Sequence, residues 1–194
     1  MTEELTEAKR VLRKQALSNR RGLSKEQREE YSGRIQKQLL EIPEFQKAKR
    51  VFAFASMPDE VHTEAILACM LEQGKEVSIP LVTGERQMEA VTFSSMEDLV
   101  PEKYGILTVK PECRKIVEPS ELDLILVPGV AFSKDGIRLG MGGGYYDAFL
   151  QRAGSAYRLA VVYNCQMFEQ VPAAPWDAQA DAILTEQGFT ICTK

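Results

Sequence analysis

Short apolar runs alternate with helix-like segments along this chain, and that alternation constrains its fold more than any other feature. Residues 51–55 and 76–80 are strand-like, and residues 62–73 between them carry apolar side chains at helical spacing. A strand that is buried on both faces has a continuous apolar sequence, because other elements cover both sides of it. Two such strands joined by a helix form a right-handed crossover in a parallel sheet. The pattern therefore predicts a three-layer α/β fold.

The rest of the chain supplies further elements of the same kinds. Residues 3–20 and the segment after Ser24 are expected to form two N-terminal helices, with Ser24 and Gln27 at capping-box spacing and Pro43 ending the second helix. Irregular chain with short helical turns is expected at residues 94–121. Additional strands are expected at residues 88–93, 122–127, 159–163, 182–185 and 189–193, and a short helix near residues 144–152. Without a repeat or a linker-like tract, residues 1–194 are expected to form one domain.

The presence of only one histidine, His62, narrows the chemistry. Sites that need two imidazoles, including the usual zinc clusters, are excluded, and a Ser-His-Asp triad would have to use His62 itself. If the chain is an enzyme, we expect its chemistry to rest on carboxylates, cations, backbone amides and a hard metal ion. His62 is expected close to a helix N-terminus, where capping and solvent exposure are the alternatives to ligand contact.

Charge is divided unevenly along the chain, whose formal net charge is −4. The first fifty residues carry an excess of Lys and Arg, and the remainder carries an excess of acids. This division indicates a local anionic ligand rather than nucleic acid, which normally needs a broader basic face; a solvated helix face is the alternative. No apolar run approaches the ~20 residues of a membrane span. The four cysteines form no C-x-x-C pair, so we expect reduced thiols and a cytoplasmic location.

A glycine-rich segment, residues 128–147, follows a buried strand and leads into a helix, and it holds nearly half of the 13 glycines. Consecutive N–H groups in such a loop cradle phosphate oxygens, and Arg138 adds a fork of donors. A P-loop would need Lys and a hydroxyl where Tyr145 and Tyr146 stand, and a dinucleotide fingerprint starting at Gly140 would need Gly at position 145. The segment therefore predicts a phosphate cradle of another type, with a purely structural turn as the alternative.

Charged and aromatic side chains accompany this segment. Asp147 either holds Mg²⁺ beside phosphates or complements the dipole of the helix that it begins, and both interpretations stay open. Tyr145 and Tyr146 either stack on a planar ligand or belong to the core. Lys9 and Arg13 lie four residues apart on a predicted helix and so share one face, as binding a triphosphate would require.

Two further carboxylates follow the strand at residues 51–55. Asp59 and Glu60 lie after its C-terminal end, the edge at which ligands of open α/β sheets bind. Asp177 and Asp181 bracket the start of a late strand, where surface polarity is the simplest interpretation.

Taken together, these separated blocks resemble the 5-formyltetrahydrofolate cyclo-ligase family over nearly the whole chain. The blocks are Lys9-x-x-x-Arg13, Ser56-Met57-Pro58-Asp59-Glu60 with Thr63, Pro128-Gly129-x-Ala131-Phe132, Gly136-x-Arg138-Leu139-Gly140-x-Gly142-x-Gly144-Tyr145-Tyr146-Asp147, and Asp177 and Asp181 with Thr185-Glu186. The resemblance implies a Rossmann-like three-layer sandwich with a mostly parallel sheet. It also implies ATP- and Mg²⁺-dependent cyclisation of 5-formyltetrahydrofolate to 5,10-methenyltetrahydrofolate through a phosphorylated formyl intermediate, with release of ADP and phosphate.

The same resemblance assigns roles to individual residues. It implies that ATP meets Lys9, Arg10, Val11, Leu12, Arg13, Arg138, Leu139, Gly140, Met141, Gly142, Gly143, Gly144, Tyr145 and Tyr146. It implies that the folate meets Ala55, Glu60, Met141, Gly142, Gly143, Gly144 and Tyr145, and that Mg²⁺ meets Asp147 and Asp177. Lys9, Arg138 and Tyr145 are the expected catalytic side chains. The expected partners are small molecules, with no nucleic acid and no membrane, and the expected state is a monomer.

Two departures from the family pattern affect these assignments. Met141 and Gly143 stand where some members carry cations, so phosphate neutralisation would rest more on Lys9, Arg13, Arg138 and the metal. Pro175-Trp176-Asp177 replaces a more polar stretch, which leaves Asp181 as an alternative metal ligand. The alternative functions are a nucleotide-independent sugar-phosphate isomerase or acyl transferase on a similar sheet, and a non-catalytic folate or nucleotide binder.

Overall fold

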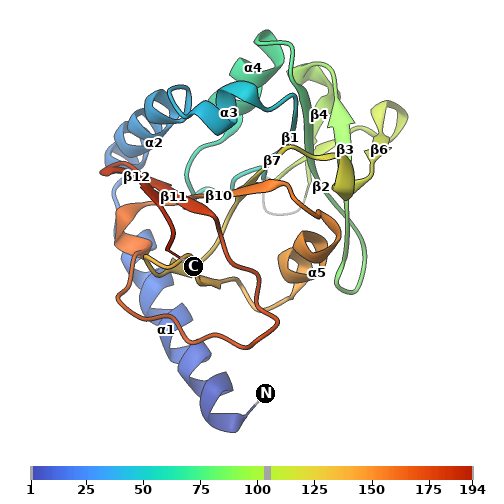
Figure 1. The fold of residues 1–194 in the computed structure, drawn as a ribbon. Helices are drawn as coiled ribbons and strands as arrows, with labels where there is room; N and C mark the ends of the chain where they lie inside the picture. The colour runs from blue at the N-terminus through green and yellow to red at the C-terminus, as the bar shows by residue number, and fades with distance from the viewer. Residues whose placement is uncertain (1, 103–105, 194) are drawn as a thin grey trace.

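The computed structural model, which describes residues 2–102 and 106–193, contains an eight-stranded sheet with the order β12-β11-β10-β7-β1-β2-β3-β6 (Figure 1). Its five central strands are parallel: β11 (Ala182–Thr185), β10 (Tyr157–Val161), β7 (Leu124–Val127), β1 (Arg50–Phe52) and β2 (Glu76–Gly84). Antiparallel strands complete its edges: β12 (Gly188–Ile191) on one side, and β3 (Gln87–Phe93) and β6 (Lys115–Val117) on the other. The predicted α/β fold with a mostly parallel central sheet is confirmed.

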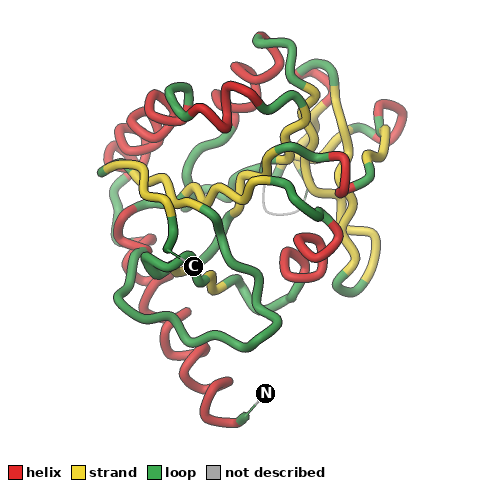
Figure 2. The backbone as a smooth tube through the Cα atoms, viewed as in Figure 1, coloured by secondary structure: helices red, strands yellow, loops and turns green. Residues whose placement is uncertain are grey.

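Alternate residues of the central strands divide the core into two layers. In β7, Leu124 and Leu126 pack into the core beneath α2 (Lys25–Leu39), α3 (Pro43–Lys47) and α4 (Glu64–Glu72). Ile125 and Val127 point to the opposite face, where they pack with α5 (Tyr145–Arg152). Figure 2 shows α2, α3 and α4 on one side of the sheet, and α5 and the N-terminal helix α1 (Glu3–Arg21) on the other. Helices therefore cover both faces, which is why the strands between them have continuous apolar sequences.

The second N-terminal helix begins where its capping residue predicts. The Ser24 hydroxyl accepts a hydrogen bond from the backbone N–H of Gln27, and the Gln27 side chain accepts one from the Ser24 N–H, which confirms the capping box of α2. The expectation for Pro43 was wrong, because α2 ends at Leu39 and Pro43 begins α3. Proline suits a first helical position, where its missing N–H would have had no partner within the helix. Among the described helices, none combines the length and the hydropathy required to cross a bilayer.

The middle of the chain is more ordered than predicted. Residues 94–121 contain β4 (Leu99–Pro101), β5 (Leu107–Val109) and β6 beside the short 3₁₀ turns η1 (Met96–Asp98), η3 (Pro111–Cys113) and η4 (Pro119–Glu121). β2 also extends beyond Pro80 to form a long antiparallel hairpin with β3. Strands of three residues are too short to show an alternating pattern, so the sequence carries little signal for them.

The glycine-rich segment has its own small structure between β7 and α5. β8 (Ala131–Phe132) and β9 (Arg138–Leu139) form an antiparallel pair within it. Outside this segment, the short 3₁₀ turn η5 (Asn164–Gln166) follows β10. Val130, Ala131 and Leu139 pack against Ala16 of α1 in a separate apolar cluster. This contact fixes α1 against the glycine-rich segment, although the two lie more than a hundred residues apart in the sequence.

Candidate functional site

A cavity of about 890 Å³ opens at the carboxyl ends of β1 and β7. Its walls come from α1, the loop after β1, the β2–β3 hairpin, β5 with the residues beside it, Arg114, the glycine-rich segment with the start of α5, and the turn at residues 174–177. This is the edge at which open α/β sheets bind ligands, and the volume is in the range of roughly 300–1,000 Å³ that is usual for small-molecule sites.

Two ion pairs join the expected phosphate-binding cations to the expected metal-binding acids. The ammonium group of Lys9 is paired with the Asp177 carboxylate, and Arg138 Nη2 lies 2.5 Å from Asp147 Oδ1. Both cations are 5% exposed. All four side chains line the cavity. The sequence-predicted groups are therefore brought together, and their charges neutralise one another in pairs.

Arg13 completes the cationic wall. Its Nε donates a hydrogen bond of 2.8 Å to the carbonyl oxygen of Gly140. A Cβ added at Gly142 would lie 3.6 Å from the Arg13 guanidinium carbon. Arg13 therefore lies directly against the glycine-rich segment, and no ion pair to it exists among the described residues.

The start of α5 depends on backbone that favours glycine. Gly144 is the N-cap residue of α5 with a φ of +73°, and Gly142 has a φ of +105°. Side chains other than glycine rarely adopt this left-handed region. No described side chain caps α5, so its first N–H groups are left at the cavity wall, where the helix dipole favours an anion.

Tyr146 packs in the core, as one of its two alternatives predicts, and it also lines the cavity; stacking on a ligand stays a prediction. Its ring lines the cavity, and it also packs 6.2 Å from the Phe52 ring and 5.8 Å from the Arg138 guanidinium, measured from ring centroids. Its hydroxyl is buried with no hydrogen-bond partner among the residues that the structure describes. Burial raises the pKa of this hydroxyl, so it stays protonated. Tyr145 lines the cavity as well and packs partly against the cluster beneath α5.

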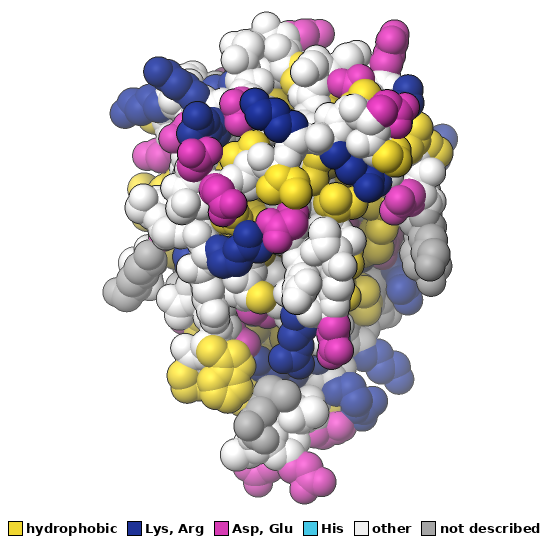
Figure 3. Space-filling view, turned by 90° about the vertical axis from the view of Figure 1, so that its right-hand side faces the viewer, with side chains coloured by type: hydrophobic (Ala, Val, Ile, Leu, Met, Phe, Trp, Pro, Cys, Tyr) yellow, Lys and Arg dark blue, Asp and Glu magenta, His cyan; other side chains and the backbone are white. Residues whose placement is uncertain are grey.

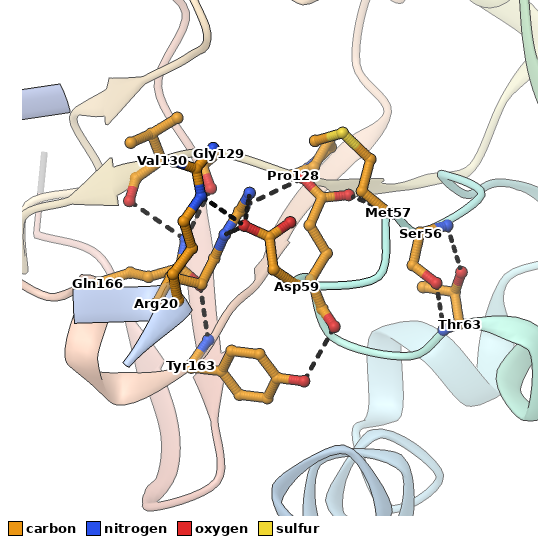
Figure 4. Close-up of polar contacts among 12 residues, drawn as sticks. Arg20, Ser56, Met57, Asp59, Thr63, Pro128, Gly129, Val130, Tyr163 and Gln166 are labelled. Atoms are coloured by element: carbon orange, nitrogen blue, oxygen red, sulfur yellow. Dashed lines mark hydrogen bonds and ion pairs between the residues drawn. The ribbon is translucent and has the colours of Figure 1, made fainter. Parts of the chain in front are cut away.

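Glu60 lies in the cavity wall and is held by groups from three segments of the chain, those of Arg20, Met57 and Tyr163, which Figure 4 labels. Its Oε1 accepts a hydrogen bond of 3.1 Å from Arg20 Nη1, and its Oε2 accepts one of 3.0 Å from the Met57 N–H. Its backbone carbonyl accepts a hydrogen bond of 2.9 Å from the Tyr163 hydroxyl. Burial raises the pKa of the Glu60 carboxyl, and the neighbouring Arg20 opposes that rise.

Sequence reasoning missed the buried groups behind this wall. Arg20 of α1 is 2% exposed and also donates to Asp59 Oδ2. Gln166 accepts a hydrogen bond from the Tyr163 N–H and donates to the carbonyl oxygens of Gly129 and Val130 (Figure 4). The one available signal was the spacing of Arg20, seven residues after Arg13, which continues the basic face of the helix.

Several other expected site residues also line the cavity, namely Ala55, Leu139, Gly140, Met141, Gly142, Gly143 and Gly144. Arg10, Val11 and Leu12 do not line it: Arg10 is exposed and bonded to Glu7, Val11 is exposed, and Leu12 packs into the small cluster behind the glycine-rich segment.

Two residues with open alternatives lie outside the cavity. His62 precedes α4, as expected; its backbone N–H donates to the Ser32 hydroxyl, and its side chain is not part of the cavity wall. Asp181 accepts a hydrogen bond from the Arg158 N–H at the base of β10 and β11 and does not line the cavity either. Of the two late aspartates, only Asp177 faces the cavity.

The carboxylates of Asp147 and Asp177 suit a Mg²⁺ ion that is shared with a phosphate ligand. They suit less well a metal ion that is held by protein side chains alone. Across residues 2–102 and 106–193, no three acidic, histidine or cysteine side chains form a group that would hold a metal ion. Mg²⁺ in phosphate sites typically takes one or two carboxylates, with phosphate oxygens and waters completing the octahedron. Asp147 and Asp177 supply such a set.

Charges of both signs are interspersed on the outside of the molecule. Figure 3 shows the face at the β3 and β6 edge of the sheet, where acidic and basic side chains intermingle between hydrophobic ones. On this face, no broad region is covered by basic side chains alone. The buried cations Lys9 and Arg138 lie instead in the cavity.

Comparison with known proteins gives one consistent family. The model of the 5-formyltetrahydrofolate cyclo-ligase family matches residues 5–186. The 5-formyltetrahydrofolate cyclo-ligase of Mus musculus is 34% identical over 193 residues, covering 92% of this chain and 94% of that protein. The protein of the same name from Escherichia coli strain K12 is 29% identical over 170 residues, covering 86% of this chain and 93% of its own.

Solved structures agree with these relatives. The NMR structure of 5,10-methenyltetrahydrofolate synthetase from Aquifex aeolicus superposes with a TM-score of 0.84 and 34% identity, covering 96% of this chain and 93% of that chain. The synthetase from Mycoplasma pneumoniae shares the fold with a TM-score of 0.74 at 24% identity, covering 92% and 98% of the two chains. The range matched by the family model includes every predicted site residue.

Proposed function

The chain belongs to the 5-formyltetrahydrofolate cyclo-ligase family and is an enzyme of this class, and from that premise we propose that its cavity cyclises 5-formyltetrahydrofolate to 5,10-methenyltetrahydrofolate with conversion of ATP to ADP and phosphate. One observation carries the proposal. A single cavity brings the buried cations of α1 and the glycine-rich segment together with the buried carboxylate of Glu60. A reaction that joins a triphosphate to a reduced folate needs both kinds of group within reach of each other.

The phosphate half of the site consists of Lys9, Arg13 and Arg138 with the N–H groups at the start of α5. Phosphoryl transfer depends mostly on positioning and charge neutralisation, so an imidazole base is not required. Cations and backbone amides aimed at the transferred group stabilise the charge that develops in the transition state. In this proposal Lys9 and Arg138 exchange their carboxylate partners for phosphate oxygens when the nucleotide binds.

Asp147 and Asp177 are the residues that would hold Mg²⁺. The ion would supply neutralisation of the nucleotide phosphates. Release of Lys9 and Arg138 toward the phosphates would free the same two carboxylates for the metal, so the four side chains suit a nucleotide and a divalent cation that arrive together.

The folate half of the site centres on Glu60. An ionised carboxylate accepts hydrogen bonds only, so Glu60 suits the N–H donors of a pterin ring. Tyr145 offers a ring on which the pterin can stack. These contacts would present the formyl group to the phosphate half of the cavity.

Cyclisation then takes place through two successive bond exchanges. The formyl oxygen forms a bond to the γ-phosphorus while the bond to ADP breaks. The neighbouring folate nitrogen next bonds to the formyl carbon and loses its proton, the carbon–oxygen bond breaks, and phosphate leaves. Lys9, Arg13 and Arg138 stabilise the negative charge on the transferred and departing phosphate oxygens.

The test is to incubate the purified protein with 5-formyltetrahydrofolate and to follow methenyl-folate absorbance and ADP release, each with and without ATP and Mg²⁺. We expect product only when both are present, in equal amounts with ADP. Glu60→Gln should raise the KM for the folate, and Lys9→Ala and Arg138→Ala should raise the KM for ATP. Absence of product would refute the proposal; turnover without nucleotide would favour an isomerase or transferase, and tight binding without ADP release would favour a binding protein.

The organisation of the protein is part of the same proposal. We expect residues 1–194 to act as one domain, as a monomer in the cytoplasm, on small molecules without nucleic-acid or membrane partners. Size-exclusion chromatography with light scattering and cell fractionation test the monomer and the location.

A further inference from the structure

We propose that Arg20 is the positioning residue for the folate half of the cavity, holding the Glu60 carboxylate from the same face of α1 that presents Lys9 and Arg13 to the phosphate half. The inference rests on the proposed function for the identity of the ligand that Glu60 meets. Arg20 itself does not line the cavity, so it acts through Glu60 and not by contact with substrate.

Arg20 donates hydrogen bonds from all three nitrogen atoms of its guanidinium group. Nη1 donates to Glu60 Oε1 at 3.1 Å, while Nη2 and Nε donate to Asp59 Oδ2 at 3.0 and 3.2 Å. Arg20 is 2% exposed, and the Glu60 side chain is 12% exposed. A planar fork of donors matches two neighbouring carboxylates in a way that a single ammonium group cannot, and its burial fixes the rotamer.

The positive charge of Arg20 is needed beside the carboxyl groups of Asp59 and Glu60. Asp59 and Glu60 are adjacent acids, and burial by itself favours the protonated form of Glu60. Arg21 also approaches Asp59, at 3.6 Å, but Arg21 is 67% exposed and its contact is screened by water. Arg20 is therefore the buried cation that opposes the effect of burial on Glu60 and orients its carboxyl group.

The geometry of α1 links this contact to the phosphate half of the cavity. Lys9, Arg13 and Arg20 occupy positions i, i+4 and i+11, which lie on one face of an α-helix. At a rise of 1.5 Å per residue, Lys9 and Arg20 are roughly 16 Å apart along the axis. The helix is attached to Asp177 and Gly140 by the first two side chains and to Glu60 by the third. One rigid element thus spans both halves.

The backbone of Glu60 is held independently of Arg20. The Tyr163 hydroxyl donates to the Glu60 carbonyl oxygen, and it lies 3.0 Å from the Ser32 hydroxyl, which in turn accepts from the His62 N–H. Removal of the Arg20 guanidinium should therefore leave the loop backbone in place, while it frees the Asp59 carboxylate and Oε1 of Glu60, whose Oε2 still accepts from the Met57 N–H. Because Asp59 does not line the cavity, the effect on the cavity wall is confined to Glu60.

The experiment compares Arg20→Gln and Arg20→Lys with Arg21→Gln, a matched control that removes the same charge from the exposed neighbour. We expect Arg20→Gln to raise the KM for 5-formyltetrahydrofolate at least tenfold and to change the KM for ATP less than twofold. The acid limb of kcat/KM for the folate should move to higher pH, because Glu60 loses its cation. Arg20→Lys should recover part of the loss, and Arg21→Gln should match the wild type. Combining Arg20→Gln with Glu60→Gln should be no worse than Glu60→Gln alone.

A second readout does not depend on turnover. The carboxyl carbon of Glu60, assigned with Glu60→Gln, is titrated by NMR in the wild type, in Arg20→Gln and in the more conservative Arg20→Lys. We expect the pKa of Glu60 to rise in Arg20→Gln and to rise less in Arg20→Lys. The role of Arg20 would be overturned by an unchanged pKa of Glu60, or by equal increases in the KM values for folate and ATP. Only the proposed function would be overturned if the wild type made no methenyl product while Arg20→Gln still shifted the pKa of Glu60.

Discussion

Replacing Gly144 by alanine tests whether the glycine-rich segment requires glycine for its backbone conformation or only for space. A Cβ at this position would lie 3.5 Å from its nearest neighbour, Arg86 Nε, which is ordinary van der Waals contact. The cost therefore comes from the φ of +73°, and a left-handed conformation costs an L-residue about 1–2 kcal/mol. For a chain of this length, 1 kcal/mol corresponds to about 2–4 °C in Tm. We expect Gly144→Ala to lower Tm by about 2–8 °C.

Gly33→Ala is the matched control with the opposite expected sign. Gly33 lies inside α2, and no atom comes within 4 Å of a Cβ added there. Alanine in a helix interior is more stable than glycine by about 0.5–1 kcal/mol, so Tm should rise by about 1–4 °C. Calorimetry and urea denaturation of both variants measure the two changes. A Gly144→Ala protein as stable as the wild type would refute the conformational argument, and Gly144→Asn should recover part of the loss because Asn tolerates this region.

Three further predictions concern the cavity wall and its support. Tyr163→Phe removes the hydroxyl that serves the Glu60 carbonyl and Ser32, so we expect about 1–3 kcal/mol lower stability in urea, and an unchanged midpoint would contradict the role of these bonds. Burial raises the pKa of Glu60, so as the pH falls this carboxylate takes up its proton at a higher pH than a free glutamate does. We expect kcat/KM for the folate to fall over the same pH range in the wild type but not in Glu60→Gln. A wild-type midpoint within the normal range of glutamate would count against the folate-binding role of Glu60. Trp176, the single tryptophan, lines the cavity and is exposed, so saturating ATP with Mg²⁺ should change its emission, and an unaltered spectrum would place the bound nucleotide away from it.

The sequence predicted the parts of the fold that depend on burial of whole elements. β7 has an apolar residue at each of its four positions because α5 covers one face and α2 to α4 cover the other. α1 and α2 have an apolar stripe at helical spacing and capping residues at their starts. Local sequence determines these features, so the sequence was sufficient for the mostly parallel sheet and for the helices beside it.

The parts that were missed depend on contacts between distant segments. α3 begins at a proline that is equally typical of a position just after a helix end, and β4, β5 and β6 are held by pairing rather than by their own pattern. Arg20 meets partners 39 and 40 residues away, and Lys9 meets one that is 168 residues away. A basic residue on an amphipathic helix is usually solvated, so residue type alone does not distinguish Arg20, which is buried, from Arg21, which is exposed.

The charge balance of the cavity depends on ion pairs, so each buried cation has to be considered together with its carboxylate partner. A simple phosphate site presents uncompensated cations, but here Lys9 and Arg138 are each neutralised by a carboxylate that lines the same cavity. A bare triphosphate that takes over these cations would leave Asp147 and Asp177 unpaired beside its own negative charge, an arrangement that low-dielectric surroundings make costly. A divalent cation removes that cost, because it neutralises carboxylates and phosphates together. The ion pairs therefore support the proposal that nucleotide and divalent cation bind together, and Asp147→Asn, which removes a carboxylate, should weaken the dependence of nucleotide affinity on Mg²⁺.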